Sequence, residues 1–412
     1  MNIKKNIIAL TVAGAFAAPV AAMAADALSS VTIYGQMNAS IDSIEDDNGT
    51  PAANNTPAAI AAATSTFKTT KNNLSSTETR IGLKGSEDMG GGLTGLWQIE
   101  SQVNLDNDGG GLDGGGLNNN RNGTTGGTRI GERNTFVGIR SAEMGTILAG
   151  RHDTPYKMST RMLDPFIFTI ADNRSIMGNT IHDDILGNVV AYISPTINNL
   201  SFAAATVFGS EMRGQVPDPL FNKKSNTVSL AGKFTMGGIY GTVAYQSIKF
   251  GTADGTFNTA DTFPALPDLD KATAMKIGGS YSMDTPNMPI KVSAVYEQLK
   301  TTTAAVVATT FKNSNLYFAG ELGVTGAVKV KAAYTMGFKT DVNGVELANS
   351  GRNQATVGAD YGLSARTTVY AQYTKLENDA VVIFQAMLGP QSTGASTGMA
   401  PSAFSVGVKH MF

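Results

Sequence analysis

The chain has 412 residues, a formal net charge of −2 and no cysteine. The missing cysteine excludes a disulfide framework and thiolate zinc or iron–sulfur sites, and the small net charge gives no reason to expect a strongly basic nucleic-acid-binding surface. Charged residues make up 16% of the chain, below the roughly 25% of typical soluble domains.

The first 24 residues have the layout of a secretory signal peptide. A lysine pair near the start is followed by an apolar run over residues 7–20 and by A-M-A at 22–24, which is an A-x-A cleavage site. The run is short and contains a proline, so we expect cleavage before Ala25 and not a membrane anchor. No later apolar run approaches twenty residues, which leaves a secreted soluble protein or an outer-membrane β-barrel.

Alternation of apolar and polar residues recurs along the rest of the chain. In V-T-I-Y-G-Q-M-N-A-S-I-D, residues 31–42, the odd positions are apolar or small and the even positions are mainly polar. Side chains two apart on a strand face the same way, so each such segment predicts an amphipathic strand. Most segments have the ten or so residues that a tilted bilayer-spanning strand needs. The sixteen predicted strands are 30–43, 77–87, 92–105, 131–141, 144–152, 188–195, 199–209, 223–236, 238–250, 271–284, 287–300, 312–324, 326–339, 351–362, 365–377 and 401–412.

The predicted connections alternate between short turns and long polar loops. A meander produces this pattern when one rim of a barrel carries turns and the other carries outer loops. A soluble two-sheet sandwich also alternates its faces, but it rarely uses so many long strands. We therefore expect an all-β, sixteen-stranded antiparallel transmembrane β-barrel over 25–412, with short periplasmic turns. The long loops are predicted at 44–76, 106–130, 153–187, 210–222, 251–270, 301–311, 340–350 and 378–400.

The closing segment, S-V-G-V-K-H-M-F, is predicted to be the strand that completes the wall. An even strand number lets the first and last strands meet, and closure leaves no unpaired backbone edge in hydrocarbon. Phe412 is then expected in an aromatic girdle at a membrane interface. Trp97, Tyr334, Tyr373 and Phe404 are expected in the same girdles.

Five segments, in order, resemble the Gram-negative general porins of the betaproteobacterial and neisserial type. They are S-V-T-I-Y-G-Q-M-N-A-S-I-D, T-R-I-G-L-K-G-S-E-D-M-G-G-G-L, R-N-T-F-V-G-I-R, G-T-I-L-A-G-R-H-D-T-P-Y and V-G-V-K-H-M-F. The resemblance implies a homotrimer and passive diffusion of small hydrophilic solutes and ions. It implies that the third loop, 153–187, folds into the lumen and that barrel-assembly machinery reads Phe412. It also implies a surrounding of outer-membrane lipid and lipopolysaccharide.

Charges at a narrow place in a pore set its ion selectivity. The candidate pore constriction has a basic wall opposite an acidic loop. The basic candidates are Arg80, Lys84, Arg133, Arg140 and Arg151, and the acidic candidates are Asp164, Asp172, Asp183 and Asp184. Arg80 and Lys84 take the lumen-facing parity, since a basic side chain facing lipid at mid-membrane costs about 2–4 kcal/mol.

Further lysines share the lumen-facing parity and favour anions. They are Lys276, Lys291, Lys329, Lys331 and Lys409. The rival interpretations are a substrate-specific channel and a surface adhesin or antigen that acts through its long loops, 44–76 and 378–400.

No enzymatic motif supports a catalytic interpretation. The chain has no G-x-S-x-G and no H-E-x-x-H, and its three histidines are His152, His182 and His410. The tract D-N-D-G-G-G-L-D-G-G-G lacks both the ending of a phosphate loop and the ligand order of a calcium loop. We therefore expect no catalytic residue, no metal site and no cofactor.

Overall fold

The computed structural model describes residues 30–48, 67–105, 130–177, 182–208, 226–250, 269–283, 285, 288–303, 308–379 and 400–412. The predicted signal peptide, 1–24, lies outside these residues. The greater part of each predicted long loop other than the third, the sixth and the seventh also lies outside them. Within the described ranges, no helix combines the length and the apolar character that crossing a membrane requires.

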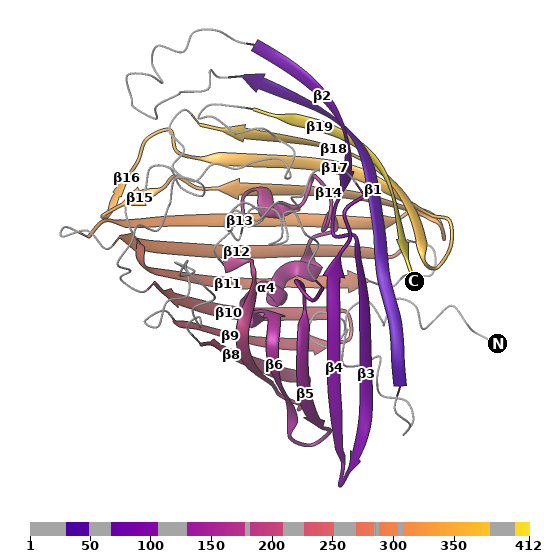
Figure 1. Cartoon of the computed structure of the whole chain (residues 1–412). Coiled ribbons are helices and arrows are strands. Elements are labelled where there is room, and N and C mark those ends of the chain that lie inside the picture. Colours follow the sequence, from indigo (N-terminus) through magenta and orange to yellow (C-terminus); the bar gives the residue numbers. More distant parts are fainter. Residues whose placement is uncertain are drawn as a thin grey trace.

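The strands form one antiparallel sheet that closes on itself (Figure 1). Most strands pair with their neighbours along the chain, and β1 also pairs with β19. The exceptions are β2 and β3, which both pair with β1, and β14, which pairs with β17. The strands are β1 Ser30–Asn48, β2 Phe67–Ser76, β3 Arg80–Gly90, β4 Leu93–Gln102, β5 Thr135–Ser141, β6 Gly145–Asp153, β7 Ile185–Ile193, β8 Leu200–Val207, β9 Asn226–Met236, β10 Ile239–Lys249, β11 Leu269–Met283, β12 Ile290–Thr303, β13 Thr310–Gly323, β14 Val328–Gly337, β15 Asp341–Val342, β16 Val345–Glu346, β17 Arg352–Gly362, β18 Thr367–Asn378 and β19 Ser402–Met411.

The barrel wall has sixteen strands, as predicted. Strands β2 and β3 both pair with β1, so they form one wall strand that is interrupted at 77–79. Glu78 lies in this interruption with a positive φ of 57°. Strands β15 and β16, with two residues each, form a hairpin in the connection between β14 and β17. Strand β15 also pairs with two residues of β13, and neither strand counts as a separate wall strand.

Pairing between β1 and β19 closes the barrel. Their register runs from Gln36 opposite Met411 to Glu45 opposite Ser402. Beyond it, Gly35 and Phe412 exchange two backbone hydrogen bonds, of 3.0 and 3.1 Å. The closed ladder leaves no strand edge exposed to hydrocarbon, which is the condition for spanning a membrane with strands.

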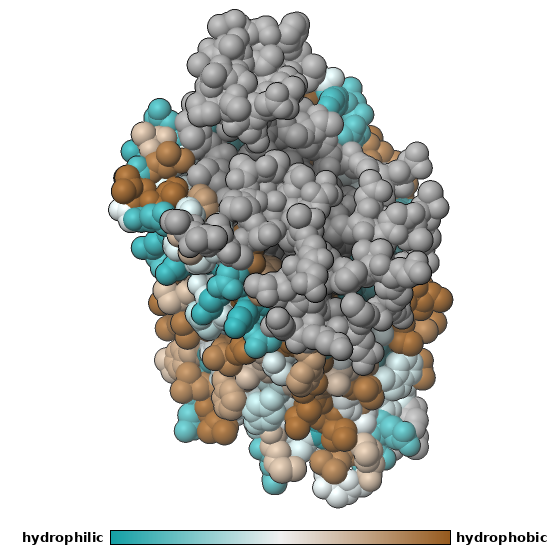
Figure 2. All heavy atoms as spheres, turned by 60° about the vertical axis from the view of Figure 1, so that its left-hand side comes forward, coloured by the Kyte–Doolittle hydropathy of each residue, from teal (hydrophilic) through white to brown (hydrophobic). Residues whose placement is uncertain are grey.

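The wall has an apolar outer face and a mainly polar inner face. On β1, Val31, Ile33 and Ile41 are each more than 60% exposed. The alternate positions on the same strand, such as Asn38 and Asp42, are buried. Apolar residues cover much of the visible outer surface below the grey part in Figure 2. The predicted parity of β1 is therefore confirmed.

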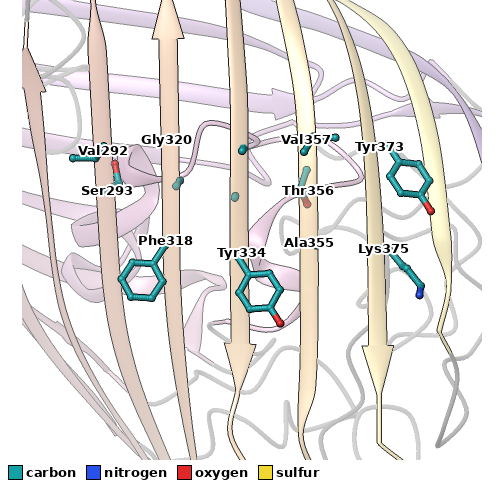
Figure 3. Close-up of a pocket in the computed structure, with 13 residues that line it drawn as sticks. Val292, Ser293, Phe318, Gly320, Tyr334, Ala355, Thr356, Val357, Tyr373 and Lys375 are labelled. Atoms are coloured by element: carbon teal, nitrogen blue, oxygen red, sulfur yellow. The ribbon is translucent and has the colours of Figure 1, made fainter.

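Aromatic rings project from the outer face of the wall. Tyr334, Tyr373 and Phe404 are exposed there, and Trp97 lies over Gly85 on the same face. Phe318, Tyr334 and Tyr373 surround a groove of about 790 Å³ (Figure 3). The groove is lined by the outer wall, with small residues between the rings, so it belongs to the lipid-facing surface and not to the pore.

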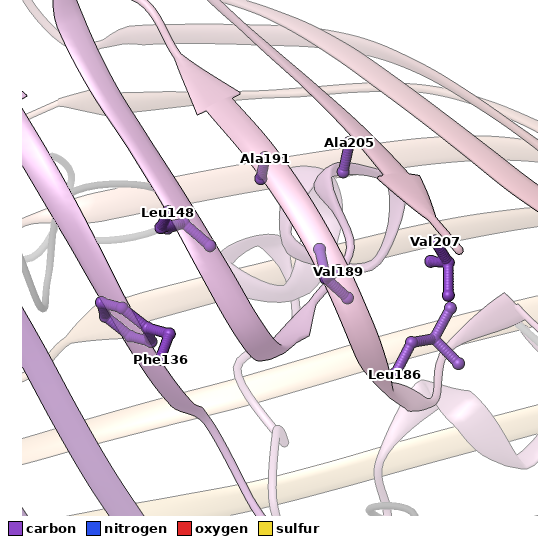
Figure 4. Packing of buried hydrophobic residues seen from close by; sticks show 7 residues of the cluster. All are labelled: Phe136, Leu148, Leu186, Val189, Ala191, Ala205 and Val207. Atoms are coloured by element: carbon purple, nitrogen blue, oxygen red, sulfur yellow. The ribbon is translucent and has the colours of Figure 1, made fainter. Parts of the chain in front are cut away.

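One sector of the inner wall is apolar. On β5 to β8, a buried cluster fills the inward positions (Figure 4), while the alternate residues Val137, Ile139 and Ile147 are exposed on the outside. The cluster consists of Phe136, Leu148, Leu186, Val189, Ala191, Ala205 and Val207. Both faces of these strands are therefore apolar at this sector of the wall.

Candidate pore constriction

The third loop begins with a short helix inside the barrel (Figure 1). Helix α4, Pro155–Thr160, follows directly on β6, and the Oγ1 of Thr154 accepts a hydrogen bond from the Lys157 backbone at 3.3 Å. A threonine cap followed by proline in the first turn is a helix-starting sequence. Lys157 also forms an ion pair of 2.8 Å with Asp153, one turn before it. The local sequence thus starts a helix where β6 ends.

Tyr156 fixes this helix to the inner wall. Its ring packs against four alanines and Leu299, all on inward positions of β8 to β12. Its backbone N–H donates to Ser229 at 3.0 Å, and its hydroxyl donates to Glu297 at 2.7 Å. Small side chains on the wall leave room for a helix to pack closely, and the buried hydroxyl has the partner it needs. The alanines are Ala203, Ala231, Ala244 and Ala274.

A second contact lies one turn further along the loop. Leu163, in the 3₁₀ turn η2 (Arg161–Leu163), is fully buried among Tyr240, Val295 and Tyr317. The Tyr317 hydroxyl donates to Asp164 at 2.8 Å. Apolar burial and a hydrogen bond to a carboxylate therefore hold the same segment against β10 to β13.

The loop then reaches the opposite side of the barrel. Asn38 on β1 donates to the Phe168 carbonyl at 2.7 Å. Ile170 and Ile176 are buried against Ile44, Leu376 and Ala403 of β1, β18 and β19. The described part of the third loop therefore contacts inward-facing residues on both sides of the barrel.

Acidic side chains of the wall pair with arginines at the constriction. Glu78 forms ion pairs with Arg80 at 2.9 Å and with Arg133, and Glu100 pairs with Arg133 at 2.9 Å. Tyr34 also donates to Glu100 at 2.9 Å. Arg133 lies just before β5 and is buried, while the side chain of Arg80 keeps 22% exposure. Of these two predicted basic residues, Arg80 is the more accessible to the lumen.

Phe168 from the loop lies between two guanidinium groups. Arg80 of the wall and Arg161 of the loop are each 5.5 Å from the centre of its ring. Phe168 has a positive φ of 66°, which is unusual for a bulky residue. The hydrogen bond from Asn38 holds the backbone of Phe168, and the two cation–π contacts hold its ring.

Asp172 holds the loop in its folded form. It accepts two hydrogen bonds from Arg161, at 3.0 and 2.6 Å, and one from the Phe168 backbone at 3.1 Å. Arg174, in the 3₁₀ turn η3 (Asn173–Ser175), adds an ion pair at 3.4 Å. Burial alone would raise the pKa of Asp172, but Arg161 and Arg174 lower it below its ordinary value. The carboxylate therefore stays charged and paired.

Asp164 has a different electrostatic environment. It is buried and accepts hydrogen bonds from the backbones of Phe166 and Asn173, at 2.8 and 2.9 Å. Burial first, and then the nearby charge of Asp172, raise the pKa of Asp164 to about 6. The loop thus contains one carboxyl group that titrates close to neutral pH.

A third charged group lies where the loop returns to the wall. Lys276 of β11 is buried between Asp183 at 3.0 Å and Glu297 at 3.5 Å, with its Nζ 4.2 Å from the Tyr156 ring centre. Burial opposes charge on Asp183, but Lys276 and then Arg161 lower its pKa below the ordinary value. Burial lowers the pKa of the adjacent His182 to about 3, so this imidazole is neutral at physiological pH.

The other predicted site residues lie away from these clusters. Lys84 faces the lumen with its Nζ 5.0 Å from the Tyr34 ring centre. Arg140 takes an inward position on β5, next to the turn to β6. Arg151 is half-buried, and its Nε has no hydrogen-bond partner among the described residues. Asp184 accepts a hydrogen bond from the next backbone N–H at 2.7 Å. The predicted set is therefore distributed over the lumen and does not form one ring.

Lumen-facing lysines gather toward the short-turn end of the barrel. Lys291 and Lys329 flank Glu321 at 3.5 and 2.9 Å, and Lys331 pairs with Asp360 at 2.8 Å. Lys409 lies within electrostatic range of three basic residues, Lys331, Lys329 and Arg80, and of one acidic residue, Asp360. In the described part of the chain, Lys84 and Lys409 have no carboxylate within 4 Å.

Sequence reasoning missed several residues of the constriction. They are Glu78, Glu100, Tyr156, Arg161, Phe168, Arg174 and Glu297. Strand parity carried a signal for three of them. Glu78 shares the parity of Arg80, Glu100 is opposite in parity to Trp97 and Ile99, and Glu297 shares the inward parity of Lys291. The loop residues gave no such signal, because their positions depend on how the loop crosses the lumen.

Residues 9–381 match the family model described as Gram-negative porin. The chain is 28% identical to the major outer membrane protein P.IB of Neisseria sicca, with 99% of this chain and 100% of the relative covered. It is 24% identical to the P.IA protein of Neisseria meningitidis serogroup C, with 94% and 96% covered.

Solved structures share the fold. The anion-selective porin from Comamonas acidovorans aligns with a TM-score of 0.66 at 18% identity, covering 93% of this chain and 100% of that one. OmpF of Salmonella typhi, in complex with daunomycin, aligns with a TM-score of 0.60 at 17% identity, covering 93% and 97%.

Proposed function

Since the chain belongs to the Gram-negative porin family and forms a passive diffusion channel of the outer membrane, we propose that small hydrophilic anions are its preferred solutes. The observation that carries this is the excess of lumen-facing lysines near the short-turn end. A passage lined by one sign of charge, with low-dielectric walls, concentrates ions of the opposite sign.

Charge pairing at the constriction supports this proposal. Arg80, Arg133, Arg161 and Arg174 are matched there by Glu78, Glu100 and Asp172, so the acidic side chains are paired and do not present an uncompensated negative ring. Toward the turn end, Glu321 and Asp360 pair with three lysines, and Lys84 and Lys409 add further positive charge to the lumen. A solute that has passed the balanced constriction therefore meets a positive field.

Reversal potentials across a planar bilayer, in a potassium chloride gradient, test the preference. We expect the purified protein to pass chloride more readily than potassium, and a Lys84→Gln/Lys409→Gln variant to shift toward potassium. Lys375→Gln is the matched control, because Lys375 lies on the outer face and pairs with Glu377 at 2.6 Å. A potassium-preferring wild type, or a double variant with the wild-type potential, would contradict the proposal.

Phe168 and its two arginines are proposed as the narrowest part of the pore. Of the predicted basic wall, Arg80 is proposed to take part directly. Lys84, Arg140 and Arg151 are proposed to act on ions that approach or leave it. The predicted loop acids Asp164, Asp172, Asp183 and Asp184 are proposed to set selectivity mainly by holding the loop in place. Arg80→Gln and Asp172→Asn test this assignment, because they should shift the reversal potential in opposite directions.

A homotrimer is proposed as the working assembly. The OmpT protein of Vibrio cholerae, solved in a trimer form, shares the fold with a TM-score of 0.57 at 14% identity. Light scattering of the detergent-purified protein should give three times the protomer mass, and a protomer mass would refute the trimer. We propose transport and no catalytic role.

Export and insertion are proposed to follow the predicted signals. Residues 1–24 would be removed on secretion, and barrel-assembly machinery would recognise Phe412 before the barrel enters lipid and lipopolysaccharide. N-terminal sequencing of the membrane fraction should begin at Ala25. Removal of Phe412 should lower the amount of inserted protein, while a wild-type amount would argue against its recognition.

A further inference from the structure

Four lysines form a row on the outer face of the barrel. Lys249, Lys271, Lys300 and Lys312 come from the adjacent strands β10, β11, β12 and β13, and all four are exposed. Lys249 stands directly opposite Lys271 in the strand register, and Lys300 stands directly opposite Lys312. Lys271 and Lys300 are diagonal neighbours, because Lys271 pairs with Thr302. Each shares its face with lipid-facing residues of its own strand, such as Val243, Met275 and Phe318.

Repulsion between these lysines favours the binding of an anion beside the row. Like charges directly opposite each other on neighbouring strands are destabilising. Among the described residues, none of the four lysines has a carboxylate within 4 Å. The nearest acids in sequence or register are Asp270, which precedes Lys271, and Asp341, which stands opposite Lys312. The carboxylate of Asp341 accepts a hydrogen bond from the Gly344 backbone at 2.7 Å.

Aromatic residues place the row at the level of lipid headgroups. Tyr245 lies four residues before Lys249 on the outer face of β10, and Tyr296 lies four residues before Lys300 on β12. Tyrosines of this kind mark the boundary between hydrocarbon and headgroups. The lysines lie further toward the long-loop rim, at a rise of about 3.3 Å per residue along the strands. Their ammonium groups are therefore beyond the hydrocarbon and next to the headgroup layer.

We infer that this lysine row binds the phosphate groups of an anionic lipid in the outer leaflet. Four adjacent strands at about 4.8 Å spacing give a row of roughly 14 Å, which is long enough for two phosphates on one headgroup. The lipid expected is therefore a diphosphorylated glycolipid, which is the headgroup chemistry of lipopolysaccharide. The lysines act as point charges toward phosphate, and burial of the acyl chains against the outer wall adds to the binding.

The test measures lipid binding to the refolded full barrel in neutral detergent. The probe is fluorescent diphosphorylated lipid A, with fully dephosphorylated lipid A as its neutral counterpart. A lysine near an anionic lipid contributes about a fivefold factor to binding. The Lys271→Gln/Lys300→Gln variant is therefore expected to bind the diphosphorylated lipid about 30-fold more weakly, while its binding of the neutral lipid stays unchanged. The quadruple variant, with Lys249→Gln and Lys312→Gln added, should lose more.

A matched double variant controls for the loss of surface charge. Lys339→Gln/Lys375→Gln removes two exposed lysines from the same rim and should bind both lipids like the wild type. Circular dichroism, together with resistance to unfolding in unheated sodium dodecyl sulfate, verifies that every variant is folded. Wild-type binding by the Lys271→Gln/Lys300→Gln variant, or an equal loss in the control, would overturn the inference. Full displacement of the lipid by millimolar pyrophosphate would also overturn it, because it would identify a site for soluble anions.

Discussion

Tyr156 of the third loop and Glu297 of the barrel wall are 141 positions apart, and the tyrosine hydroxyl donates to the carboxylate at 2.7 Å. Glu297 also accepts a hydrogen bond from Asn315 at 2.8 Å and lies 3.5 Å from the ammonium of Lys276. One wall carboxylate therefore links the loop helix to three neighbouring strands.

Removal of that hydroxyl should loosen the loop without opening the barrel. A hydrogen bond to a charged group contributes about 1.5–3 kcal/mol, so Tyr156→Phe should raise loop opening by about 10- to 150-fold. Hydrogen exchange of the amides over 155–177 measures this, and the wall strands should stay protected. Tyr192→Phe is the control, since Tyr192 donates to a turn carbonyl at 2.8 Å on the exposed surface. Unchanged exchange in Tyr156→Phe would show that apolar packing alone holds the helix.

Buried and exposed lysines should differ sharply in their contribution to stability. Removal of one partner from a buried ion pair costs about 3–5 kcal/mol, so Lys276→Met should lower the free energy of unfolding by about that amount. Lys329→Met removes a lysine whose side chain is 49% exposed, and it should cost at most about 1 kcal/mol. Urea unfolding of the refolded barrels measures both values. Equal losses in the two variants would contradict the structure.

Opposite changes in selectivity should follow from the two sides of the constriction. Arg80→Gln removes a partly exposed positive charge beside Phe168, so the reversal potential should shift toward potassium. Asp172→Asn removes the partner of Arg161 and Arg174, so the shift should be toward chloride, with noisier single-channel current from a looser loop. Shifts of the same sign in both variants would refute the assigned charge arrangement.

Acidification should increase anion preference through Asp164. Its pKa is raised to about 6, so the carboxyl is ionised at pH 7 and mostly protonated at pH 5. Because its pKa in the folded protein lies above the ordinary value, proton uptake between these two values favours the folded loop, and the lumen loses one negative charge. The chloride preference should therefore be greater at pH 5 than at pH 7.

Asp164→Asn should remove this dependence and resemble the wild type at pH 5 throughout. His182 does not contribute in this range, because burial lowers its pKa to about 3. A variant that keeps the full pH response would exclude Asp164 as its source.

Strand positions in the wall were predictable because the bilayer imposes an alternating pattern on every spanning segment. Strand β2 was the exception, since it falls within the predicted loop 44–76. Its sequence, F-K-T-T-K-N-N-L-S-S, is polar on both faces, and Leu74 is its one exposed large apolar residue among those whose side chains are described. A strand that continues the wall with polar residues on both faces carries no hydrophobic period that a sequence reader can detect.

The inward orientation of some candidate constriction residues was predictable, but their pairing was not. Parity placed Arg80 and Lys84 on the inner face, which is where they lie. The partners of Arg80 could not be read from the chain, because Glu78 lies in a local interruption of the strand and Phe168 arrives from a loop 88 positions later. The alanines that pack against Tyr156 could not be identified from the sequence either, because a small inward-facing residue gives no information about what packs against it.

Because the third loop is attached on both sides of the lumen, we expect the size limit of the channel to be fixed. A loop attached on one side could move in and out of the lumen. The size limit of the channel would then depend on how often the loop moved out. Here Tyr156 forms a hydrogen bond to β12 and Phe168 forms one to β1, so the segment is attached at both ends. The size exclusion limit should then depend on side-chain length. Replacing Phe168 with a shorter or longer residue should change the largest solute that passes, while the barrel stays unchanged.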